Sequence, residues 1–153
     1  MKKASILIVD DNEGILETLS AILEEKGYRT DTAKNGREAI EKSKMNFYNM
    51  ALLDIKLPDI EGTKLLTKIE ETTPRMVKIM VTGYAALENA VEALNLGADA
   101  YIMKPVDPEN LLEIVNEKLK EQRKAEKMNQ TKVAEWIETR ARLLTEKGNR
   151  DRE

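Results

Sequence analysis

Short apolar runs and helical apolar spacings alternate along the first 120 residues of the chain. Each apolar run is followed by a stretch in which apolar residues recur every three or four positions. The runs are typical of strands buried on both faces of a sheet, and the spacing is typical of amphipathic helices. The expected apolar strands are 5–9, 50–53, 77–81 and 100–103, and residues 28–33 are expected to form a more polar strand. Strict alternation predicts an α/β fold with a parallel sheet and right-handed crossovers.

The pattern changes in residues 121–153, which contain no proline and whose first glycine is Gly148. These residues are therefore able to extend the last helix. From about residue 131, apolar side chains fall along one side of a helix, which predicts an amphipathic interaction helix. Its main apolar positions are Val133, Trp136, Ile137 and Leu144. Three alternatives stay open: docking on the same chain, pairing with a partner or a second copy, or a solvated tail.

Composition removes several classes of function. The chain has 153 residues, 41% of them hydrophobic, with no cysteine and no histidine. Disulfides, thiolate catalysis, Ser-His-Asp triads and His-ligated zinc are therefore excluded. A net charge of -3 argues against nonspecific binding of nucleic acid. Because we find neither a signal peptide nor an apolar run long enough to span a membrane, we expect a soluble, cytoplasmic protein with no membrane partner.

Polar side chains follow four of the five expected strands. Asp10 and Asp11 follow the first, Asp54 follows the third, Thr82 follows the fourth and Lys104 follows the fifth. In parallel α/β sheets, sites form beyond the carboxyl ends of the strands. The sequence therefore predicts that three carboxylates, one hydroxyl and one ammonium meet at one edge of the sheet.

Such a group of carboxylates favours a divalent cation. Three carboxylates close together repel one another, and a hard cation such as Mg²⁺ relieves this repulsion. Mg²⁺ keeps positions open for phosphate oxygens, so a carboxylate beside it can attack phosphorus. The residues therefore point to phosphoryl chemistry that depends on Mg²⁺.

The set of motifs closely resembles the response-regulator receiver family over about residues 4–120. The motifs are Ile-Leu-Ile-Val-Asp10-Asp11, Ala-Leu-Leu-Asp54, Leu57-Pro58-Asp59 with Gly62, Val81-Thr82-Gly83 and Tyr101-Ile-Met-Lys104-Pro105. The resemblance implies a flavodoxin-like, doubly wound, five-stranded parallel sheet of order 2-1-3-4-5 with helices on both faces. It implies a receiver domain in residues 1–120, and residues 121–153 are expected to form a helical extension.

The resemblance also implies a role for each site residue. Asp54 is similar to the phosphoacceptor, and the metal site would comprise Asp10, Asp11, Asp54 and the backbone carbonyl of Lys56. Thr82 and Lys104 match the residues that contact the phosphoryl group. Tyr101 matches the rotating switch aromatic, and Pro105 matches a proline that follows a cis bond. Lys56 and Tyr84 occupy the two positions that tune the lifetime of the phosphoryl group.

By resemblance, the chain is a phosphorylation-activated response regulator of a two-component system or phosphorelay and not a turnover enzyme. A sensor histidine kinase or phosphotransfer protein would be the phosphodonor. The output would be binding of a downstream protein or formation of a homodimer. We expect no DNA-binding domain, because only about thirty residues follow the receiver.

Three alternatives remain at this stage. A phosphohydrolase of the haloacid dehalogenase type also uses an aspartate nucleophile, but it usually has a second aspartate two residues later, where this chain has Lys56. A DNA-binding regulator would need more residues after the receiver. A constitutive interaction module would not need the complete acidic set. Taken alone, Asp11 is equally well explained as the cap of the following helix.

Overall fold

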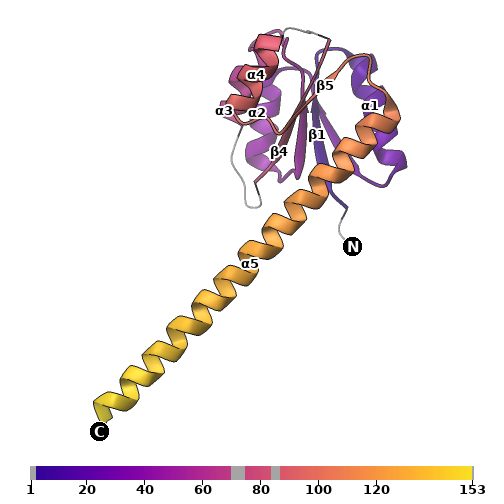
Figure 1. Ribbon diagram of the computed structural model, residues 1–153. Coiled ribbons are helices and arrows are strands. Elements are labelled where there is room, and N and C mark those ends of the chain that lie inside the picture. Colours follow the sequence, from indigo (N-terminus) through magenta and orange to yellow (C-terminus); the bar gives the residue numbers. More distant parts are fainter. Residues whose placement is uncertain (1–2, 70–74, 84–86, 153) are drawn as a thin grey trace. The chain divides into compact units, whose positions relative to one another are not determined.

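The computed structural model describes residues 3–69, 75–83 and 87–152. Five parallel strands form one sheet in the order β2-β1-β3-β4-β5. Figure 1 shows the sheet with helices on either side of it. The strands are β1 (Ser5–Val9), β2 (Arg29–Ala33), β3 (Met50–Leu53), β4 (Val77–Thr82) and β5 (Ala100–Met103). The predicted α/β class and the strand order 2-1-3-4-5 are confirmed.

Helices cover both faces of the sheet. They are α1 (Glu13–Glu25), α2 (Gly36–Met45), α3 (Gly62–Lys68), α4 (Leu87–Asn95) and α5 (Pro108–Arg152). Leucines of α1 and the first turns of α5 pack with alternate strand residues into one buried cluster. Apolar residues of α2, α3 and α4 pack with the other strand residues into a second cluster. The neighbouring strands β1 and β3 are buried on both faces, which explains their largely apolar sequences.

The strand order reverses between β1 and β3. From β1 the chain goes to β2 on one side, and it then crosses to β3 on the other side of β1. Ligands of doubly wound sheets bind where the strand order reverses in this way. Val9 of β1 pairs with Leu53 of β3, so Asp10 and Asp54 follow these neighbouring positions. The fold therefore brings the two aspartates to the same point of the sheet edge.

Local signals set both ends of α1. The side chain of Asn12 accepts a hydrogen bond from the backbone N–H of Ile15 at 3.1 Å, so Asn12 is the N-cap of α1. The alternative reading of Asp11 as this cap is therefore wrong. Gly27, just after α1, has a φ of 91°, a left-handed conformation that glycine adopts readily.

By their internal contacts, the residues form two compact units, Met1–Leu119 and Lys120–Glu153. The first contains the sheet. In the second, the described residues are helical, and their large apolar side chains are exposed, among them Val133, Trp136, Ile137 and Leu144. Within the ranges that the structure describes, none of the helices is long and apolar enough to cross a membrane.

Candidate functional site

One ammonium group joins the two carboxylates that follow β1 and β3. The Nζ atom of Lys104 lies 2.7 Å from Oδ2 of Asp10 and 3.2 Å from Oδ2 of Asp54. Asp10 and Asp54 are buried, with 3% and 7% of their surface exposed. Ion pairs in such partly dry surroundings are stronger than pairs on the open surface. The predicted meeting of these three residues at the sheet edge is observed.

Backbone hydrogen bonds fix the strand ends that carry Asp54 and Lys104. The N–H of Asp54 donates to the carbonyl of Val9 at 3.0 Å, and the N–H of Lys104 donates to the carbonyl of Thr82 at 2.9 Å. Each bond continues the ladder of the sheet by one residue beyond the assigned strands. The side chains at these positions are therefore held by the sheet itself and not by free loops.

The acidic residues form a compact cluster suited to a metal ion. Carboxylate oxygens of Asp10, Asp11 and Asp54 lie within 4.8 Å of one another, and Asp11 is exposed. Several carboxylate oxygens at a partly open position are the donors that Mg²⁺ prefers, with waters in the remaining positions. The donor set therefore fits Mg²⁺, which is typical of the receiver family that the sequence resembles.

Lys104 is held in its charged form. Its burial lowers its pKa, but the hydrogen bond to Asp10 and the charges of Asp54 and Asp10 outweigh this, so that the pKa is raised. A protonated Lys104 balances part of the negative charge of the acidic cluster. The same ammonium is placed to pair with an anionic group carried by Asp54.

The loop after Asp54 returns closely to the strand. The N–H of Lys56 lies 3.4 Å from Oδ1 of Asp54, a long contact. The N–H of Gly62 donates to the carbonyl of Ile55 at 2.6 Å, and Lys56 forms an antiparallel bridge with Glu61. The backbone of Lys56 is thus part of a short closed loop beside the acceptor candidate.

The remaining receiver residues border the same site. Thr82 is the last residue of β4 and is buried, with 2% of its surface exposed. Tyr101 is partly buried against the core cluster on the α2, α3 and α4 face. Burial and then the negative charge of Asp54 raise the pKa of Tyr101. The Lys104-Pro105 peptide bond is cis. Tyr84, the second lifetime position, lies outside the described residues.

A groove of about 470 Å³ adjoins the site. Its walls come from α1 and from the segment that joins β5 to α5. Ile15, Leu19, Ile22 and Val106 give it an apolar lining, and Lys104 forms part of its wall. An apolar surface therefore continues directly from the acidic cluster.

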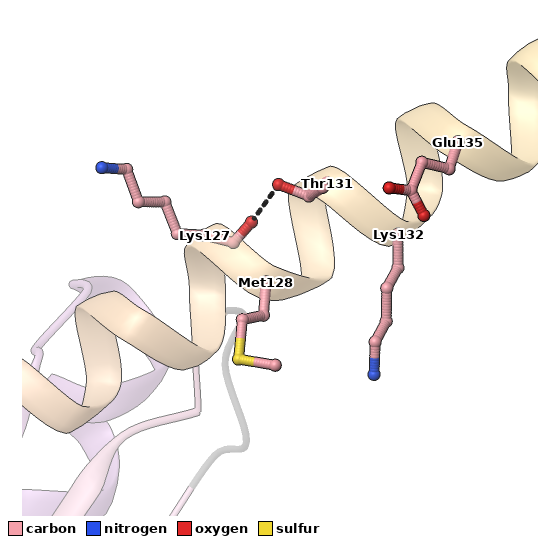
Figure 2. A pocket seen from close by; sticks show the side chains of 5 residues that line it. All are labelled: Lys127, Met128, Thr131, Lys132 and Glu135. Carbon is pink, nitrogen blue, oxygen red and sulfur yellow. Dashed lines mark hydrogen bonds between the residues drawn. The ribbon is translucent and has the colours of Figure 1, made fainter.

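The residues of the predicted interaction helix lie in the second compact unit and not in the sheet that carries the acidic cluster. A second hollow lies in that unit, and Figure 2 shows its side chains, Lys127, Met128, Thr131, Lys132 and Glu135. The Thr131 hydroxyl donates to the carbonyl of Lys127 at 3.0 Å. All five residues belong to α5. A hollow bounded by the side chains of one helix has no opposing wall, so we assign no site to it.

Sequence reasoning missed the roles of two residues around the site. Asn12 caps α1 directly after the acidic pair, and its N–H donates to Oδ1 of Asp10 at 2.9 Å. An asparagine three residues before an apolar helical position is a local signal for a cap. Asp59 binds the start of α2, more than twenty residues away in sequence. No local pattern reveals such a distant contact.

The comparisons with known proteins agree with this geometry. Residues 6–116 match the family described as "Response regulator receiver domain". The chain is 55% identical to a CheY-like response regulator receiver domain protein from Methanospirillum hungatei JF-1. That crystal structure superposes with a TM-score of 0.77 and is matched over 81% of this chain and 99% of its own.

Curated relatives are longer proteins. The transcriptional regulatory protein ZraR of Klebsiella oxytoca is 34% identical over 82% of this chain, and the regulatory protein AtoC of Escherichia coli K12 is 38% identical over 74% of it. The chain spans 28% and 25% of these two proteins. The family match covers more than two thirds of the chain and coincides with the five-stranded sheet and its acidic edge. The chain belongs to the response regulator receiver domain family, in which phosphorylation of an aspartate is characteristic.

Proposed function

We propose that this chain accepts a phosphoryl group on Asp54 with Mg²⁺, and that Asp10, Asp11, Asp54 and the backbone carbonyl of Lys56 hold the cation. One observation carries the proposal. Asp54 is buried, pairs with the ammonium of Lys104 and belongs to a carboxylate cluster that fits a divalent cation. No other group of three or more carboxylates with this spacing occurs among the described residues.

The transfer is a displacement at phosphorus. A carboxylate oxygen of Asp54 forms the new P–O bond, and the bond between phosphorus and the donor atom breaks, so that the donor keeps the electron pair. The donor atom is a histidine nitrogen in a kinase or phosphotransfer protein, or an oxygen in acetyl phosphate. Bound Mg²⁺ would neutralise charge on the phosphoryl oxygens. Lys104 stays protonated and pairs with another of these oxygens, and Thr82 donates a hydrogen bond.

The output follows as a shift between two conformations. The phosphoryl group draws Thr82 and Lys104 toward Asp54. Tyr101 then turns into the space that Thr82 leaves. To move the population from 1:99 to 99:1, the phosphoryl group must favour one state by about 5.5 kcal/mol. The partly buried position of Tyr101 supports this role, because the residue still has exposed surface to bury when it turns inward.

We further propose two contact surfaces. The groove beside Lys104 gives the phosphodonor an apolar surface next to Asp54. The helix from about residue 131 offers exposed apolar side chains to a downstream protein or to a second copy. In this role the chain is a switch, whose only catalysis is its own phosphorylation and dephosphorylation. We assign the described residues no DNA-binding role.

Mass spectrometry of the intact chain after acetyl phosphate treatment tests the acceptor. We expect one phosphoryl group in the presence of Mg²⁺ and none after chelation. Asp54→Asn removes the acceptor, and Glu17→Gln, at an exposed position on α1, is the matched carboxylate-to-amide control. Phosphorylation of Asp54→Asn to the level of the control would disprove the assignment. Continuous turnover of a small phosphate ester would instead support the phosphohydrolase alternative.

A further inference from the structure

Asp59, in the loop between β3 and α3, binds the first amides of a different helix. Its Oδ1 accepts the backbone N–H of Gly36 at 2.8 Å, and its Oδ2 accepts the N–H of Arg37 at 2.9 Å. These amides begin α2, where backbone donors have no partner within the helix. Asn35 accepts the next amide, that of Glu38, at 2.8 Å. Asp59 thus completes the cap of α2 from a loop 22 residues further along the chain.

A close steric fit accompanies these hydrogen bonds. A Cβ atom built on Gly36 would lie 2.1 Å from Cγ2 of Ile60, the residue after Asp59. The absence of a side chain at Gly36 therefore leaves room for Ile60. Ile60 is partly buried and packs against the core cluster on the α2, α3 and α4 face. The tip of the loop is thus fixed by both polar and apolar contacts.

The base of the same loop is closed. Lys56 and Glu61 form an antiparallel bridge, and the N–H of Gly62 donates to the carbonyl of Ile55. The loop begins directly after Asp54 and contains Lys56 close to its base. With its base closed and its tip attached to α2, the loop has little freedom to move away from the acidic cluster.

We infer that Asp59 is a positioning residue, which holds the backbone of Lys56 ready for the cation and thereby links Mg²⁺ binding to the start of α2. The inference rests on the proposed function, because it takes the Lys56 carbonyl as a metal ligand. Cation binding and loop ordering are reciprocal. If a fixed loop favours binding of the cation, the bound cation must also stabilise the loop and the α2 amides that Asp59 binds. A residue that only caps α2 would stabilise the helix without affecting the cation.

Two measurements on the full chain separate these roles. The first is the dissociation constant of Mg²⁺, measured by calorimetry without a phosphodonor. Asp59→Ala removes both hydrogen bonds, and Asp59→Asn keeps one acceptor oxygen. Glu61→Gln is the matched control, because it removes a negative charge from the same loop, and the Glu61 side chain makes no cap hydrogen bond. The second measurement is hydrogen exchange of the Gly36 and Arg37 amides with and without Mg²⁺.

We expect Asp59→Ala to weaken Mg²⁺ binding about tenfold, as is usual when a group that orients a metal ligand is lost. The Mg²⁺ affinity of Asp59→Asn should lie between the affinities of Asp59→Ala and the unaltered chain. Glu61→Gln should change the affinity no more than about twofold. Mg²⁺ should slow exchange of the two amides in the unaltered chain but not in Asp59→Ala.

Each other outcome overturns the inference in a distinguishable way. If Asp59→Ala and Glu61→Gln weaken Mg²⁺ binding equally, only the lost negative charge matters. A lower thermal stability of Asp59→Ala with unchanged Mg²⁺ affinity would leave Asp59 as a simple cap. If Asp59→Ala does not fold, the same comparison is made with Asp59→Asn. Failure of the unaltered chain to bind Mg²⁺ would overturn the proposed metal site together with this inference.

Discussion

Gly62 approaches Asp54 so closely that a Cβ atom on the glycine would lie 2.1 Å from the backbone carbonyl oxygen of Asp54. The same atom would lie 2.8 Å from Cα of Ile55. Both neighbours are backbone atoms, which cannot turn aside as a flexible side chain can. The first residue of α3 is therefore a glycine for a steric reason that involves the acceptor candidate directly.

Gly62→Ala should destabilise the fold and displace Asp54. We expect the free energy of unfolding to fall by about 3 kcal/mol, the upper part of the usual range for overpacking, because backbone must shift. Urea unfolding measures the loss. Gly148→Ala is the control: nothing lies within 4 Å of a Cβ there, and the position is helical. Gly148→Ala should change stability by no more than about 1 kcal/mol. Equal stability of the two variants would contradict the steric argument.

Lys104→Met should bind Mg²⁺ more tightly than the unaltered chain. The ammonium group lies 2.7 Å from Asp10, so it repels a cation held by the same carboxylates. Methionine keeps most of the apolar stem without the charge. Calorimetric titration measures the change, and Lys34→Met, which removes an exposed lysine paired with Glu13, is the control. Weaker Mg²⁺ binding by Lys104→Met than by this control would show that the ammonium organises the carboxylates more than it opposes the cation.

The difference in Mg²⁺ affinity between Lys104→Met and the unaltered chain should be lost only at high pH. The pKa of Lys104 is raised above its ordinary value of 10.5, so the ammonium stays charged throughout the neutral range. The difference in Mg²⁺ affinity should therefore be constant from about pH 6 to pH 9 and should disappear only as the pH rises through the raised pKa. A difference that already disappears near neutral pH would show that Lys104 loses its proton there.

The fluorescence of Trp136 should report on the extension. Trp136 is the only tryptophan, and 63% of its surface is exposed in the single chain, where the guanidinium of Arg140 lies 5.5 Å from the ring centre. If a second copy or a partner covers this face, the emission should shift to the blue as protein concentration rises or after phosphorylation. Ile137→Asp, on the apolar face, should abolish the shift, and Thr139→Asp, on the opposite side of the helix, should not. Exposed emission from a monomer under every condition would mean that the helix has no binding role in the isolated chain.

The sequence by itself determined where each strand ends and which polar residue follows it. A buried parallel strand is a continuous apolar run, and such a run shows where each strand ends and which residue follows it. The sequence alone therefore assigns Asp10, Asp54 and Lys104 to one sheet edge, since parallel strands end on the same side. The strand order came from the resemblance, because apolar periodicity does not say which strands are neighbours.

Tertiary structure decided how these groups are paired and held. Lys104 reaches both Asp10 and Asp54, across 94 and 50 residues of sequence. Asp59 caps a helix that ended 14 residues before it, and Gly62 leaves space for the backbone of Asp54. Such contacts depend on the spacing between segments that lie far apart in the chain. Local patterns record burial and helix ends, but only the packed fold fixes which distant atoms meet.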